Sequence, residues 1–73
     1  MKENLKEGER AIIIGLTGSR EFQSFLLSNG ISLGAIVTKN FSPSFSKLVN
    51  FTIGAKMLSL KVTDFEMIEL IKI

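Results

Sequence analysis

The sequence predicts a mainly β domain: a small, five-stranded, partly open barrel with one helix between its first two strands and a short helical turn before its last strand. Two observations support this prediction. Segments with period-two alternation of apolar residues recur along the chain, and a single segment with helical spacing interrupts them near the N-terminus. With 73 residues, the chain has the length of one small domain, which we expect to cover residues 1–73.

The predicted strands are the segments that alternate. The first covers Ala11 to Leu16 and ends at Thr17-Gly18-Ser19, where turn and capping residues replace branched apolar ones. The other four are Ala35 to Phe41, Lys47 to Ile53, Lys56 to Val62 and Met67 to Ile73. Gly54-Ala55 is predicted to form a short turn between the third and fourth strands. Residues 63–66 are predicted to form one helical turn, because Thr63 can cap it.

One amphipathic helix is predicted between the first two strands. Ser19 is a suitable N-cap, and Arg20 to Asn29 complete nearly three turns. Phe22 and Leu26 lie one turn apart on the same face, so we expect both to pack inward and to cover one opening of the barrel. Gly30 supplies the left-handed residue that commonly ends a helix.

Five short strands in this order favour an SH3-like barrel, because closure removes most of the exposed sheet edge. A five-stranded OB-fold is the alternative, although its helix normally falls later in the strand order. Neither barrel has room for a large internal cofactor in so short a chain.

The residue types exclude most catalytic chemistry. The chain contains no histidine and no cysteine. It therefore lacks the usual zinc ligands, the general base of a serine or cysteine triad, and any disulfide. We expect a protein that is not an enzyme and binds no cofactor. The absence of cysteine is compatible with a reducing cytoplasm.

Carboxylates are the only candidate metal ligands. Glu7 and Glu9 lie early in the chain, and Asp64, Glu66 and Glu69 lie late. Such pairs can hold a hard cation, but a solvated face is the interpretation we favour. Ferrous iron favours sites that include imidazole, so we assign no metal ligand.

The sequence predicts neither a secretory signal peptide nor a transmembrane helix. Met1-Lys2-Glu3-Asn4 carries charges of both signs and no apolar run of signal-peptide length. The longest apolar runs are far shorter than the ~20 residues of a transmembrane helix. We expect a cytoplasmic protein without direct membrane insertion.

Charge and aromatic residues mark the middle of the chain. No acid occurs between Glu21 and Asp64, and the basic residues in that interval are Lys39, Lys47, Lys56 and Lys61. We interpret these lysines as residues that keep strand edges from pairing with other chains. The alternative is that they form a docking surface. Phe41 and Phe45 lie in the predicted loop between the second and third strands. We expect one of them to cover the barrel opening, and the alternative is an exposed anchor for a partner.

The order of these motifs resembles the bacterial ferrous-iron transport protein A (FeoA) family over nearly the whole chain. That family has an opening Leu-x-x-Gly-x-x-Ala, a helix ending in Leu-Leu-x-x-Gly-apolar, a glycine before the next strand, and a late Leu-basic-x-x-acid-x-x-x-Ile. The similar residues here are Leu5, Gly8 and Ala11; Leu26-Leu27-Ser28-Asn29-Gly30-Ile31; Gly34; and Leu60-Lys61-Val62-Thr63-Asp64-Phe65-Glu66-Met67-Ile68.

The sequence also departs from the family pattern. Phe25 stands where the family usually has arginine, Leu33 where it has proline, and Phe65 where it has alanine. Gly54 is about one residue away from the family's turn glycine.

The resemblance implies a cytoplasmic accessory of FeoB, a membrane transporter with a G-protein domain that takes up ferrous iron. On this hypothesis Phe41 and Phe45 anchor the partner, and Lys39, Lys47 and Lys61 orient it. The alternative is a small barrel module that binds another protein or single-stranded nucleic acid, with the lysines against phosphates and a phenylalanine stacked on bases.

Overall fold

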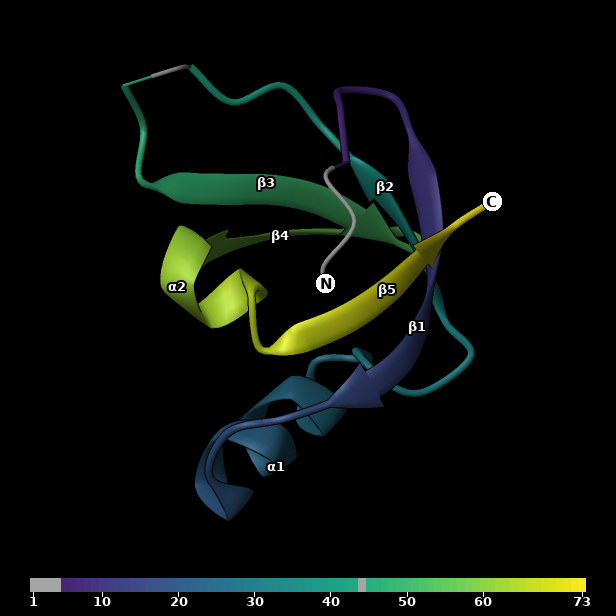
Figure 1. Cartoon of the computed structure of the whole chain (residues 1–73), viewed down its shortest axis with the longest axis vertical. Helices are drawn as coiled ribbons and strands as arrows, with labels where there is room; N and C mark the ends of the chain where they lie inside the picture. The colour runs from purple at the N-terminus through teal and green to yellow at the C-terminus, as the bar shows by residue number, and fades with distance from the viewer. Residues whose placement is uncertain (1–4, 44) are drawn as a thin grey trace.

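In the computed structural model, the described residues, 5–43 and 45–73, form five strands and two helices. Their order is β1 (Arg10–Leu16), α1 (Arg20–Ser28), β2 (Ile36–Lys39), β3 (Leu48–Ile53), β4 (Lys56–Lys61), α2 (Val62–Phe65) and β5 (Ile68–Lys72). All neighbouring strands are antiparallel, in the order β4-β3-β2-β1-β5. The sheet curls into a partly open barrel whose edge strands, β4 and β5, are linked by α2 (Figure 1). The predicted fold class and element order are confirmed.

The core fills the inside of the curled sheet. Its fully buried side chains come from four of the strands, α1 and the segment after α1: Ile13, Leu26, Ile31, Val37, Phe51 and Ile68. Phe51 of β3 lies opposite Leu58 of β4, and its ring centroid is 5.4 Å from that of Phe65 in α2. The short helix α2, which links the two edge strands, therefore places an aromatic ring against the core.

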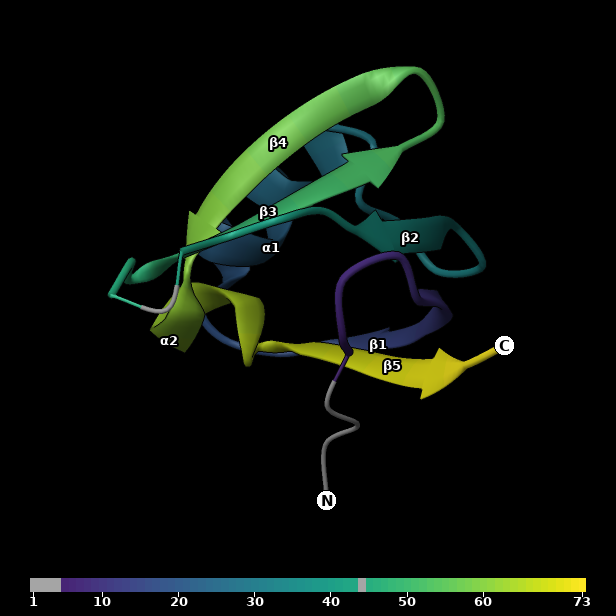
Figure 2. The same ribbon diagram turned by 90° about the horizontal axis from the view of Figure 1, so that it is seen from above.

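Helix α1 lies at one end of the barrel (Figure 1) and is seen behind β3 and β4 in the view of Figure 2. The Ser19 hydroxyl accepts a hydrogen bond from the Phe22 N–H at 3.1 Å. Ser19 is therefore the N-cap of α1, as the sequence predicts. Leu26 is fully buried, and Phe22 is half-buried against the same core. The prediction that these two side chains face inward is confirmed.

The chain leaves α1 through a left-handed backbone conformation at residue 30, which accounts for the glycine there. The helix stops at Ser28, one residue before the predicted end, and Asn29 is the C-cap. Gly30 has a φ of 84°, a left-handed conformation that favours glycine. The N–H of Ile31 then donates to the carbonyl of Leu26 at 2.9 Å, which folds the buried Ile31 back onto the core.

Several predicted boundaries are wrong by one or two residues, each for a local reason. β2 begins at Ile36 because the Ala35 N–H closes a turn to the Ser32 carbonyl at 3.1 Å. β4 ends at Lys61 because the carbonyl of Val62 already accepts from the Glu66 N–H within the α2 turn. The late helical turn consequently covers residues 62–65 rather than 63–66.

Candidate protein-binding surface

The loop between β2 and β3 lies at the end of the barrel opposite α1 (Figure 1). Phe41 is 61% exposed and Phe45 is 87% exposed, and neither belongs to the core. The expectation that one of them closes the barrel opening is therefore wrong. Instead, two aromatic side chains project from the same loop into solvent.

Asn50 of β3 holds the first part of this loop. Its Nδ2 donates to the Phe41 carbonyl at 3.0 Å, and its backbone N–H donates to the Ser42 hydroxyl at 3.2 Å. Its Oδ1 accepts from the Ser59 hydroxyl of β4 at 2.6 Å. These bonds connect the loop to two strands and fix the backbone next to Phe41. Sequence reasoning missed Asn50; the only signal was an amide within an otherwise apolar alternation.

Lys47 and Lys61 come together beside this loop. Leu48 pairs with Lys61 across β3 and β4, and the Val62 N–H donates to the Lys47 carbonyl at 2.9 Å. Both lysines line an open hollow of about 440 Å³, the other lining residues being Ser46, Val62 and Thr63. No carboxylate lines the hollow, and neither lysine forms an ion pair with any residue that the structure describes. This corner of the molecule therefore presents two lysines that have no ion-pair partner among the described residues.

Lys39 lies elsewhere. It is half-buried at the end of β2, where its carbonyl accepts from the Gly8 N–H at 2.8 Å and its N–H donates to the Glu9 carbonyl at 3.0 Å. Its strand neighbour in β3 is the buried Phe51. Of the three lysines predicted to orient a partner, the structure thus brings only Lys47 and Lys61 together.

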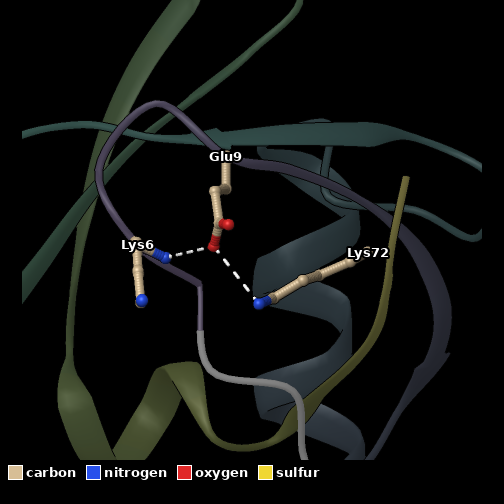
Figure 3. A network of polar contacts seen from close by, with 3 residues as sticks. All are labelled: Lys6, Glu9 and Lys72. Atoms are coloured by element: carbon tan, nitrogen blue, oxygen red, sulfur yellow. Dashed lines mark hydrogen bonds and ion pairs between the residues drawn. The ribbon is translucent and has the colours of Figure 1, made fainter.

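A polar network joins the N-terminal turn to β5 (Figure 3). The Glu9 Oε1 accepts from the backbone N–H of Lys6 at 2.7 Å and lies 3.3 Å from Nζ of Lys72. The bond from the Lys6 N–H, assisted by the Lys72 ammonium, lowers the pKa of the Glu9 carboxyl below its usual 4.5. This carboxylate therefore links the N-terminal turn to the last strand.

The Glu9→Gln variant should be less stable than the parent at neutral pH. A carboxyl whose pKa is lower in the folded than in the unfolded chain stabilises the fold above its unfolded pKa, and that contribution disappears as the pH falls through the folded pKa. Urea unfolding across this acid range should show the two proteins converging. Glu7→Gln is the control, because no polar contact of the Glu7 side chain is seen among the described residues. Identical pH profiles for the two variants would contradict the role assigned to Glu9.

Carboxylates are the only candidate metal ligands in the sequence, and none of them is assigned as one. Among residues 5–43 and 45–73, no group of three or more acidic side chains is close enough to hold a metal ion. In the same part of the chain, no helix has the length and apolar character needed to cross a membrane.

Comparison with known proteins gives a likeness in structure but none in sequence. The chain matches no protein-family model, and no curated protein matches it. Among solved structures, it is similar to the iron uptake regulatory protein FeoA, with a TM-score of 0.82 and 16% identity over 94% of this chain and 89% of that one.

A manganese-dependent transcriptional repressor is similar as well, with a TM-score of 0.85 and 14% identity over 93% of this chain. This likeness covers only 38% of the repressor chain. The domain therefore has the FeoA-like, SH3-like fold, which is shared by the iron uptake regulatory protein FeoA and by part of the manganese-dependent transcriptional repressor.

Proposed function

We propose that this protein is an accessory of ferrous-iron uptake that docks on the cytoplasmic side of an FeoB-type transporter and modulates its nucleotide cycle or its pore. The observation that supports docking most directly is the pair of exposed phenylalanines on one loop, next to a corner that presents two lysines without an ion-pair partner among the described residues. The likeness to the iron uptake regulatory protein FeoA supports the choice of partner.

Each residue of this surface has a distinct role in the proposal. Phe41 and Phe45 are the anchors, because aromatic side chains buried at an interface commonly contribute most of its binding energy and slow dissociation. Lys47 and Lys61 attract an acidic face of the transporter and raise the association rate. Lys39 is a weaker candidate, because its side chain is half-buried away from the other two lysines.

A binding module for another protein or for single-stranded nucleic acid is the second candidate. The likeness to part of a transcriptional repressor favours a module of this kind. Nucleic-acid binding requires a basic groove that follows the backbone of the strand. Lys47 and Lys61 provide only a short basic corner.

The test is capture of the purified transporter in detergent by the immobilised protein. The double variant Phe41→Ala/Phe45→Ala should bind at least about tenfold more weakly, because loss of an interface anchor typically costs ~2 kcal/mol or more. Phe25→Ala is the matched control: Phe25 is 50% exposed, and it lies on α1 at the opposite end of the barrel (Figure 1). Lys47→Gln/Lys61→Gln should mainly slow association.

Ferrous-iron uptake in cells that lack the protein gives the second readout. Uptake should fall, return with the parent and Phe25→Ala, and not return with the double phenylalanine variant. Unchanged uptake in the deletion strain, together with equal capture by all variants, would overturn both the assigned role and the surface. Affinity for single-stranded nucleic acid that falls steeply with salt would favour the second candidate.

A further inference from the structure

Strand β4 is an open edge of the sheet. Among the described residues its only strand partner is β3, and it lies at one margin of the ribbon in Figure 2. Bonded and non-bonded pairs alternate along an antiparallel ladder. Because the Val62 N–H bonds to the Lys47 carbonyl, the N–H and C=O groups of Met57 and Ser59 point away from β3. Within residues 5–43 and 45–73 these backbone groups have no strand partner, so they can bond to another strand.

The side chains along this edge determine what it can accept. Lys56 and Lys61 stand at its two ends, and Met57 between them is 73% exposed. Neither lysine is ion-paired within the described chain, and Lys61 also lines the hollow beside β4. Two copies of β4 paired antiparallel would place Lys56 of one copy at the same end of the ladder as Lys61 of the other, which disfavours self-association.

We propose that β4 binds an extended segment of a protein partner as a sixth strand, and that this segment has an acidic residue near each end and apolar residues between them. Backbone bonds to Met57 and Ser59 would supply affinity, and the acidic residues facing Lys56 and Lys61 would supply selectivity. One end of the segment would enter the hollow lined by Lys47 and Lys61. The inference rests on the proposed function in that the segment belongs to the docked partner.

The probe is a synthetic peptide of alternating valine and threonine with glutamate at each end, compared with the same peptide with lysine at each end. Fluorescence anisotropy of the labelled peptides against the full-length protein measures both affinities. We expect the glutamate peptide to bind roughly tenfold more tightly, since it forms an attractive pair with each lysine where the lysine peptide places like charges together. The Lys56→Glu/Lys61→Glu variant should reverse the preference.

A proline tests the backbone bonds. Ser59→Pro removes the outward N–H, and proline is tolerated on a strand edge where that N–H faces solvent. Its matched control is Ser59→Ala, which removes only the hydroxyl bond to Asn50. We expect Ser59→Pro to lower peptide affinity about tenfold and Ser59→Ala to leave it unchanged, with thermal denaturation showing that both variants fold. If Ser59→Pro fails to fold, the charge-reversal result decides alone.

The outcomes separate this inference from the proposed function. Equal affinities for the two peptides, or binding of neither at millimolar concentration, would overturn the inference. Lys56 and Lys61 would then serve to prevent strand pairing at this edge. If Phe41→Ala/Phe45→Ala weakens transporter capture while Ser59→Pro does not, docking stands and the sixth strand is wrong. If the peptides bind as expected but the transporter is not captured, the edge is correct and the assigned partner is wrong.

Discussion

Replacing Phe51 with alanine should cost about 3–5 kcal/mol of the free energy of unfolding, as removal of a large buried aromatic side chain does. Phe51 is fully buried in β3 and packs its ring against Phe65, so the variant loses this contact together with those to the strands on either side. A domain of 73 residues has a total stability of only roughly 4–11 kcal/mol. The loss is therefore a large fraction of the whole.

Urea and thermal unfolding measure this effect. At roughly 4–8 °C per kcal/mol for a domain of this size, the melting temperature should fall by more than about 12 °C. Phe45→Ala is the matched control: the same atoms are removed from a side chain that is 87% exposed, and the change should stay within about 0.5 kcal/mol. A Phe51 variant as stable as the Phe45 variant would place the core elsewhere.

The glycine-containing motifs were the most informative parts of the sequence, because each encodes a local geometry. In the opening Leu5-x-x-Gly8-x-x-Ala11, Leu5 and Ala11 are buried, and Gly8 has a φ of 85° in a turn closed by the Glu9 N–H on the Lys6 carbonyl. Only glycine adopts such a backbone readily. A pattern of this kind predicts both the turn and the inward residues on its two sides.

The local backbone also shows why leucine can occupy position 33. Leu33 stands where the FeoA family has proline, before Gly34, which has a φ of 87°. The two residues are the centre of a turn closed by the Ala35 N–H on the Ser32 carbonyl. The first central position of such a turn favours proline but accepts most residues. The exposed Leu33 fits it without disturbing the barrel.

The candidate surface was less predictable, because it depends on strand register and on which loop residues fold inward. Asn50 reaches the Phe41 carbonyl only when β3 is in place, and Lys47 meets Lys61 only through the pairing of β3 with β4. No local pattern shows that Lys39 lies apart from these two. Composition showed which residue types could form a binding surface, and the tertiary pairing determined which of them are neighbours.

The Leu26→Ala variant should lose about 2–5 kcal/mol of stability, since it removes a fully buried side chain that joins α1 to the barrel. Leu26 has a second role through its backbone, because its carbonyl accepts from the Ile31 N–H at the helix end. Alanine keeps that carbonyl and is a good helix former, so the measured loss reports the side chain.

Leu27→Ala is the matched control on the adjacent position. Leu27 is 53% exposed on the same turn of α1, so its replacement removes the same atoms from the same helix at a similar change in helix propensity. We expect the Leu27 variant to stay within about 1 kcal/mol of the parent, because roughly half of its side chain is already in water. Chemical denaturation of the three proteins gives the comparison. If Leu26 faces the barrel and Leu27 faces solvent, their replacement by alanine must cost different amounts of stability. Equal losses at the two positions would therefore mean that α1 does not cover the barrel end with the face that includes Leu26.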